Sequence, residues 1–330
     1  MTMPAGREPL RSVPTGLPTG DLLATGPITA DLAVPDRALA IGAHPDDIEF
    51  GCGATLARWA AAGCQVHHLI LTDGSKGSWD VTADIPALIR TRQEEARAAA
   101  RVLDGDRVFG GRAATVLAGI PDDWPSIDVS PRENGSSIGT GTATGTTGHE
   151  RVSFLGRVDG ELQNGSEERR QVARIMRTIQ PGVVLAHDPW RRYRLHPDHR
   201  AAGFLALDSV VAARDPHFFA DLGLPPHRPT SILLWEADVP NHVEASGGFE
   251  QVKIDALLCH RSQFESTMGI GNHERDVFDG RLGATPGQFA VTTADRERRA
   301  FSAKVRQQLA QHGSLAGLSS AEAFHLLSDI

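Results

Sequence analysis

The fold class is decided by residues 38–47, which read ALAIGAHPDD. The first six residues form a short apolar run, which is typical of a strand buried on both faces. The segment from Gly53 to Ala62 is rich in alanine and ends before Gly63, as a helix with a glycine C-cap does. A buried strand that leads into a helix is the first unit of an alternating α/β protein.

The same alternation continues along the chain. Apolar runs predict strands at 66–71, 152–155, 183–186 and 231–235, and helical patterns occupy 86–103, 167–179, 198–213 and 249–264. Parallel strands need crossover connections of this kind, and the crossing helices cover both faces of the sheet. The sequence therefore predicts an α/β fold of the Rossmann-like class, with a mostly parallel sheet and a single catalytic domain over residues 37–330.

Two segments fall outside this alternation. Residues 1–36 are rich in Pro, Gly and Thr and have no hydrophobic period, which predicts a flexible N-terminal arm. Residues 104–148 also lack periodicity and contain the Gly/Thr run 139–148. Since a structureless connection of that length is uncommon inside a domain, we expect a disordered insertion or a lid, and the composition favours disorder.

The composition narrows the class of protein. The 330 residues carry 33 Lys plus Arg against 41 Asp plus Glu, a net charge of −8, so a nucleic-acid binder with a dense basic face is not expected. No apolar run approaches the ~18 residues of a membrane span, and no signal peptide is recognisable. The three cysteines form no C-x-x-C pair, which favours a reduced compartment. We expect a cytoplasmic protein that acts on a small molecule, with a homo-oligomer left open.

Two short motifs follow predicted strands. His44-Pro45-Asp46-Asp47 comes directly after the first strand, and His196-Pro197-Asp198-His199 follows the fourth strand and opens a helix. The carboxyl ends of parallel strands meet at one edge of an open sheet, where ligands bind. Two imidazoles and one carboxylate from these motifs would hold a catalytic zinc with one position left open, and a spare Asp and His would remain for proton transfer.

Helix capping offers a simpler explanation for each motif alone. Asp46 or Asp47 would cap the helix that follows the first strand, and Asp198 would do the same for the later helix. A cap, however, requires neither His44 nor the pair His196 and His199. Two His-Pro-Asp motifs at matching places in the predicted sheet therefore favour a functional site.

The two motifs and several intermediate pieces resemble the PIG-L (LmbE-like) family of zinc-dependent N-deacetylases. The pieces are Thr72-Asp73-Gly74, Arg92-x-x-Glu95, 159–162 (DGEL), 187–190 (HDPW) and 260–263 (HRSQ). The resemblance covers about 38–103 and 152–264. It implies hydrolysis of an N-acyl group, with acetyl as the expected group, from an amino-sugar conjugate such as an N-acetylglucosamine (GlcNAc) derivative, by an enzyme that acts on linear amides.

The resemblance also implies the metal centre. It implies that His44, Asp47 and His199 are ligands of Zn²⁺, with another divalent metal such as Fe²⁺ left open. Asp46 would then be the general base that takes a proton from the attacking water. A carboxylate beside a metal ion suits that role, because the ion lowers the pKa of its water to ~7.

The remaining roles concern the substrate. By resemblance, His196 stabilises the oxyanion and protonates the leaving amine, and Asp198 orients it. Arg92 and Asp159 are expected to hold sugar hydroxyls. An imidazole with a carboxylate partner is a reasonable proton donor to nitrogen.

The sequence departs from the family at two places that bear on function. Members of the mycothiol branch carry a Tyr two residues before the first His of the second motif, where this chain has Arg194 with Tyr193 adjacent. The family also passes from the second helix to the third strand by a few residues, where this chain has residues 104–148. Two alternatives stay open: an amidase of mycothiol S-conjugates, and a non-catalytic, metal-stabilised sugar-binding protein.

Overall fold

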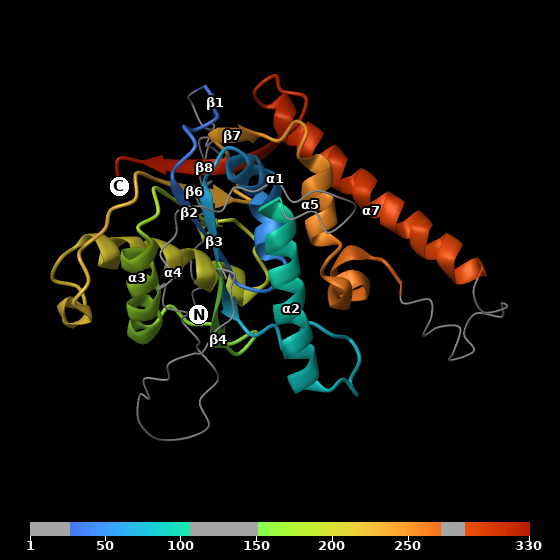
Figure 1. Cartoon of the computed structure of the whole chain (residues 1–330), viewed down its shortest axis with the longest axis horizontal. Helices are drawn as coiled ribbons and strands as arrows, with labels where there is room; N and C mark the ends of the chain where they lie inside the picture. Colours follow the sequence, from blue (N-terminus) through green and yellow to red (C-terminus); the bar gives the residue numbers. More distant parts are fainter. Residues whose placement is uncertain (1–26, 106–150, 272–287) are drawn as a thin grey trace, which may run out of the picture.

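The computed structural model describes residues 27–105, 151–271 and 288–330, and the side chains of the last range from residue 295. These residues form a single eight-stranded sheet in the order β1-β7-β8-β6-β5-β2-β3-β4 (Figure 1). The strands are β1 (Thr29–Ala30), β2 (Arg37–Gly42), β3 (Gln65–Thr72), β4 (Val152–Arg157), β5 (Val183–His187), β6 (Ser231–Trp235), β7 (His242–Ala245) and β8 (Ala321–Ser328). All pairings are parallel except those of β8, which runs antiparallel to β6 and β7. The predicted mostly parallel α/β sheet is confirmed.

Helices cover both faces of the sheet, as Figure 1 shows. One face carries α1 (Asp47–Ala61), α2 (Ile85–Leu103) and α5 (Glu250–Leu257), with α7 (Gln288–Ser314) packed beside α5, and the other carries α3 (Ser166–Ile179) and α4 (Pro197–Arg214). Short turns complete the described chain: η1 (Ala220–Leu222), η2 (Arg261–Gln263) and η3 (Phe264–Met268).

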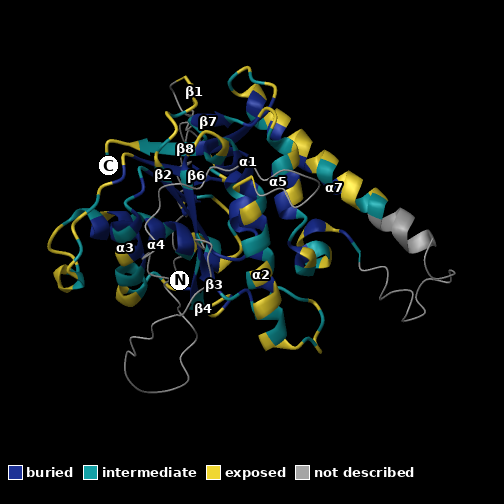
Figure 2. Ribbon diagram, in the orientation of Figure 1, coloured by how far each residue is buried: buried dark blue, intermediate teal, exposed yellow. Residues whose placement is uncertain are grey.

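The central strands are buried on both sides because alternate side chains enter two separate cores. Ala38 and Ala40 of β2 pack with helix α1 in one core, whereas Leu39 and Ile41 pack with α3 and α4 in the other. Figure 2 shows the buried strands between helices whose outer faces are exposed. This double burial explains why the strands read as unbroken apolar runs.

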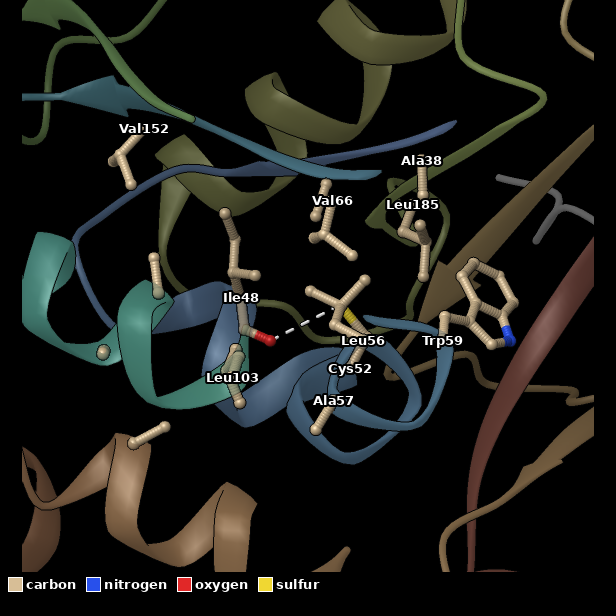
Figure 3. Close-up of a cluster of buried hydrophobic side chains, with 14 of the residues drawn as sticks. Ala38, Ile48, Cys52, Leu56, Ala57, Trp59, Val66, Leu103, Val152 and Leu185 are labelled. Atoms are coloured by element: carbon tan, nitrogen blue, oxygen red, sulfur yellow. Dashed lines mark hydrogen bonds between the residues drawn. The ribbon is translucent and has the colours of Figure 1, made fainter. Parts of the chain in front are cut away.

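Helix α1 is bent inside the first core. Cys52 has non-helical backbone angles (φ −148°, ψ 20°), and its thiol contacts the Ile48 carbonyl oxygen at 3.4 Å (Figure 3). The bend exposes the amides of the second half of the helix. Glu322 of β8 accepts hydrogen bonds from the Ala54 amide (3.1 Å) and the Thr55 amide (2.7 Å), so a buried carboxylate caps the restarted helix.

Two glycines allow helices to approach the strand ends that carry the motifs. A Cβ on Gly51 of α1 would lie 2.5 Å from the Trp235 ring, and a Cβ on Gly203 of α4 would lie 2.5 Å from the His187 carbonyl oxygen. Both contacts are closer than any real Cβ makes. The glycines therefore let α1 pack closely against the end of β6 and α4 against the end of β5.

The structure corrects three predictions that were made from the sequence. Residues 27–36 are not a loose arm, because β1 pairs with β7 and the Leu32 amide donates to Glu244 (2.9 Å). The helix predicted over 249–264 ends at Leu257 and gives way to η2 and η3. The helix predicted from Gly53 already begins at Asp47. The rest of the predicted arm, and nearly all of the predicted insertion, lie outside the described residues.

Candidate metal centre

The two His-Pro-Asp motifs meet at the carboxyl edge of the sheet. His44 follows the end of β2, and His196 is the N-cap residue of α4, which follows β5. His44 and His199 are 155 positions apart in the chain, yet His44 Nδ1 lies 3.2 Å from His199 Nε2. The parallel pairing of β2 with β5 brings both loops to the same edge.

Three residues form a tight triangle through their donor atoms, and Asp47 contributes a different carboxylate oxygen to each of its two sides. His44 Nδ1 lies 3.2 Å from His199 Nε2 and 3.3 Å from Asp47 Oδ2, and His199 Nε2 lies 3.3 Å from Asp47 Oδ1. Ligand atoms about 2.1 Å from a tetrahedral metal ion lie about 3.4 Å from one another. Two imidazole nitrogens and a carboxylate at this spacing fit a divalent metal ion, and these are the three residues expected as ligands.

Two buried carboxylates hold the other nitrogen of His44. Asp198 Oδ2 lies 3.1 Å and Asp159 Oδ1 3.2 Å from His44 Nε2. Asp198 in turn accepts from the amides of Gly160 (2.6 Å) and Leu162 (3.1 Å). A proton on Nε2 satisfies these carboxylates and leaves Nδ1 with its lone pair toward the metal triangle.

This arrangement corrects the expected partner of His196. Asp198 has no exposed surface, and its carboxylate faces His44 rather than the ring of His196. The reason is their place on α4: the N-cap His196 is exposed, whereas Asp198 in the first turn is buried and accepts from the amides after β4. The Asp198 amide instead donates to His196 Nδ1 (3.3 Å), which places the proton of a neutral imidazole on Nε2.

His196 itself stands at the open side of the centre. Its exposed ring stacks on His199 with 5.0 Å between centroids and meets His44 edge-on at 4.5 Å. Partial burial and the neighbouring imidazoles lower the pKa of His196. A neutral, exposed imidazole beside the ligand triangle is placed to meet a substrate.

The adjacent aspartates Asp46 and Asp47 have opposite electrostatic surroundings. Burial raises the pKa of Asp46 to about 6, opposed by the Arg92 guanidinium, whose Nη2 lies 3.8 Å away. Burial acts on Asp47 too, but the imidazoles of His199 and His187 hold its pKa well below the ordinary value. Carboxylates whose pKa values diverge in this way suit different roles, one as a ligand and one as a base.

Arg92 and Asp159, expected at sugar hydroxyls, are engaged with the protein. Buried Arg92 donates to the carbonyl oxygens of Gly74 and Pro45, both at 2.8 Å. Asp159 Oδ2 accepts from the Lys76 amide at 3.1 Å. The structure thus places both residues behind the metal-ligand loop, where they fix its position, and the predicted sugar contacts stay a prediction.

His187 belongs to the centre although the sequence assigned it no role. Its Nε2 lies 3.2 Å from Asp47 Oδ2, and its Nδ1 accepts from Trp235 Nε1 at 3.0 Å. The indole fixes the proton on Nε2, so the ring donates to Asp47. Its place directly after the predicted strand 183–186, within the HDPW motif, was the signal that it lies at this edge.

Arg194, at the position where the sequence departs from the family, lies behind the centre. Its Nη2 is 2.6 Å from His199 Nδ1 and 3.1 Å from His187 Nδ1, and it forms an ion pair with Glu236. Arg191 binds the other oxygen of the same carboxylate at 3.0 Å. Glu236, in the loop after β6, thus neutralises Arg191 and Arg194, which follow β5.

Comparisons with known proteins identify the family of the chain. The family model described as PIG-L, GlcNAc-PI de-N-acetylase, matches residues 39–127 and 137–210. The chain is 30% identical over 231 residues to diacetylchitobiose deacetylase of Thermococcus kodakarensis, covering 69% of this chain and 70% of that protein. It is 34% identical over 286 residues to the 1D-myo-inositol 2-acetamido-2-deoxy-alpha-D-glucopyranoside deacetylase of Segniliparus rotundus, covering 81% and 80%.

A solved structure shares the fold. N,N'-diacetylchitobiose deacetylase from Pyrococcus horikoshii aligns with a TM-score of 0.62 at 24% identity, over 89% of this chain and 84% of that one. In the described part of this chain, no helix is long and apolar enough to cross a bilayer.

The fold and the imidazole–carboxylate centre define a metal-dependent amide hydrolase. The family model covers the segments that carry His44, Asp47 and His199, and relatives at 30% identity or more are matched over at least 70% of their length. The chain belongs to the PIG-L family of N-deacetylases. The predicted family and enzyme class are confirmed.

Proposed function

We propose that the protein is a zinc-dependent hydrolase that removes the N-acetyl group from an amino-sugar conjugate of the GlcNAc type. The observation that carries this proposal is the triangle of His44, Asp47 and His199 donor atoms with Asp46 beside it. The similar proteins of Thermococcus kodakarensis and Segniliparus rotundus are named as deacetylases of diacetylchitobiose and of a GlcNAc–inositol. Their names support an acetylated amino sugar as the substrate.

The ligand residues would hold zinc, which supplies Lewis acidity toward the amide carbonyl and a lowered pKa of water. Asp46 takes the proton that the attacking water releases as the new C–O bond forms. The Nε2–H of His196 faces the developing oxyanion. The proton held by Asp46 passes through solvent to His196, and the imidazolium so formed delivers a proton to the amine as the C–N bond breaks. Acetate and the free amino sugar leave, with the Asp46 carboxylate and the neutral His196 both restored.

The surrounding residues position these groups. Asp198 and Asp159 hold His44 through Nε2, and His187 holds Asp47 through its own Nε2–H. Arg92 fixes the Pro45 carbonyl and so the loop that carries Asp46. Carboxylate or imidazole partners of this kind keep ligands oriented, and their loss typically costs 10–100-fold in metal affinity or activity.

The test is mass-spectrometric detection of the mass lost by a panel of N-acylated glucosaminides. The panel contains N-acetylglucosamine, diacetylchitobiose, GlcNAc–inositol and a mycothiol S-conjugate, each with protein loaded with Zn²⁺ or Fe²⁺. We expect loss of the acetyl group from the GlcNAc compounds. Cleavage of the S-conjugate alone would identify the amidase alternative instead, and no cleavage with fully loaded protein would refute the proposal.

A further inference from the structure

The loops that follow β3 and β4 are joined by hydrogen bonds beside the metal centre. The Asp159 amide donates to Asp73 Oδ1 at 3.1 Å, and Asp159 Oδ2 accepts from the Lys76 amide at 3.1 Å. The Lys76 ammonium donates to Glu161 Oε1 at 2.9 Å. A Cβ on Gly160 would lie 3.3 Å from Lys76 Nζ, so the ammonium packs against the turn of the second loop. The two loops thus present one ion pair, Lys76–Glu161.

The charged groups of this pair face solvent, whereas the backbone that carries them is fixed. The side chains of Lys76 and Glu161 are 53% and 64% exposed. Gly160 and Leu162, on either side of Glu161, donate their amides to the buried Asp198 carboxylate at 2.6 and 3.1 Å. An exposed ion pair adds only about 0–1 kcal/mol to stability. The fold therefore gains little from the pair, but a ligand would find a donor and an acceptor there.

On the side of the proposed base, one guanidinium connects the metal centre to the pair. Arg92 Nη2 lies 3.8 Å from Asp46 Oδ1, and Arg92 Nη1 lies 3.9 Å from Asp159 Oδ2. The same Asp159 oxygen accepts from the Lys76 amide. The side chains of Arg92 and Asp159 thus link the proposed base to the backbone of Lys76.

On the side of the proposed acid, the first turn of α4 makes the connection. The Asp198 amide donates to His196 Nδ1 at 3.3 Å, and the Asp198 carboxylate binds the two amides that flank Glu161. His196 and Glu161 are both exposed. The pair is therefore tied to both proton-transfer groups and lies beside the open side of the centre, where the acetamido group of a substrate would enter.

The two charged groups together suit hydroxyl groups as partners. An ammonium only donates hydrogen bonds and a carboxylate only accepts them, whereas a hydroxyl does both. Two neighbouring hydroxyls match the pair, one accepting from Lys76 and the other donating to Glu161. Because the pair has no net charge, a charged substituent would have to break it to bind.

We propose that the Lys76–Glu161 pair binds two neighbouring hydroxyls of the ring that carries the acetamido group, and so selects an uncharged, polyhydroxylated ring. This inference rests on the proposed function and adds residues that recognise its substrate. Arg92 and Asp159 support the pair, because they bind the Gly74 carbonyl and the Lys76 amide of the loop that carries it.

The test uses the substrate of the panel that wild-type protein cleaves fastest, with analogues that lack the 3- or the 4-hydroxyl of the acetylated ring. We expect wild-type kcat/KM to be about tenfold or more lower for the deoxy analogues, as the loss of a hydrogen bond to a charged group predicts. Lys76→Met and Glu161→Met should each lose about tenfold with the intact substrate, mainly through KM. Each variant should then cleave the intact substrate and one deoxy analogue equally well.

A matched control removes a cation from an ion pair at the other end of α4. Arg214, the last residue of that helix, pairs with Asp215 at 2.9 Å, and Arg214→Met should discriminate between the substrates as wild type does. Metal analysis and thermal melting accompany the kinetics. We expect all three variants to keep their zinc and to melt within a few degrees of wild type, since exposed pairs contribute little to stability.

Three outcomes are decisive. Wild-type discrimination against both deoxy analogues in Lys76→Met and Glu161→Met would overturn the inference. Loss of zinc from these variants would also overturn it, because the pair would then support the metal ligands. Absence of acetate release from wild-type protein with every substrate would instead refute the proposed function, and calorimetric Kd values for the same ligands would then decide on the pair.

Discussion

Asp46 and Asp47 are adjacent in the chain, but their carboxylates have different surroundings and different proposed roles. Asp47 begins α1 and turns its carboxylate toward His44, His187 and His199, while Asp46 sits at the N-cap with a positive φ of 114°. The backbone turn at Asp46 points the two carboxylates in different directions. A left-handed conformation at a non-glycine residue is uncommon, and such strain is often found at functional sites.

Removing a ligand should remove the metal. His199→Ala deletes one of three donor groups, so we expect the variant to lose its bound zinc and its activity together. Elemental analysis of the purified protein measures this. His217→Ala, at an exposed histidine far from the motifs in sequence, is the control and should keep its metal. Full zinc occupancy in His199→Ala would disprove the ligand set.

Removing the proposed base should leave the metal in place. Asp46→Asn keeps the size of the side chain but cannot take a proton, so we expect turnover to fall by ~10²–10⁴-fold with zinc retained. Steady-state kinetics and metal analysis of the same sample separate the two effects. Loss of zinc would show that Asp46 is a ligand, and normal turnover would show that another group activates the water.

The sequence could predict which residues gather at the site but not how they pair. Strand ends at one edge place His44 and His199 together regardless of detail, so topology predicted that the two motifs meet. The choice of His44, Asp47 and His199 as ligands came from the family resemblance and stays a prediction. The partner of Asp198 depended on whether its side chain turns inward or outward in the first turn of α4. His187 was missed because a single histidine at a strand end equally suits a buried core residue.

At the scale of elements, the part of helix α1 that follows the bend at Cys52 depends on a carboxylate from near the other end of the chain. Glu322 caps the Ala54 and Thr55 amides and pairs with buried Lys253. Lys253 also donates to the Phe50 carbonyl oxygen at 2.7 Å, on the other side of the bend. The cluster thus supports the bend that lies between the metal loop and the body of the helix.

Loss of this carboxylate should destabilise the fold. Glu322→Ala leaves the Lys253 ammonium buried without its partner and two helix amides without a cap, so we expect unfolding to become easier by about 3–5 kcal/mol. Urea denaturation measures the change. Glu265→Ala, at an exposed position, should stay within about 0.5 kcal/mol of wild type. Similar small changes in both variants would contradict the role of Glu322.

The elements that the sequence predicted well are those with strong local signals. Buried runs such as 231–235 match β6 residue for residue. The bend at Cys52 left no local signal, because its cap comes from β8. The two-residue strand β1 was missed because its partners are the distant His242 and Val243.

At the scale of the molecule, the ends of the long connection between α2 and β4 lie close together. Asp104 and Arg151 form an ion pair at 3.9 Å, and the Arg151 carbonyl accepts from the His68 amide at 2.8 Å. The family model matches part of this connection and leaves out residues 128–136. A short linker could therefore join the two ends.

Shortening the connection should preserve the fold. We expect deletion of 106–147 to change the melting temperature by only a few degrees, because loop-closure entropy depends weakly on length. Deletion of 128–136 alone is the control. If the longer deletion precipitates or melts far earlier while the shorter one does not, residues on either side of 128–136 pack on the core, and the predicted disorder is wrong.

The central claim, a metal-dependent deacetylase with its metal at the edge of the sheet, is tested most directly by titrating stripped protein with Zn²⁺. Bound zinc and acetate released from diacetylchitobiose are measured in the same samples. We expect no release from stripped protein and a rate that rises in proportion to bound zinc, saturating at about one ion per chain, as three protein ligands around one ion require. Release that is independent of bound metal, or full loading without release, would contradict it.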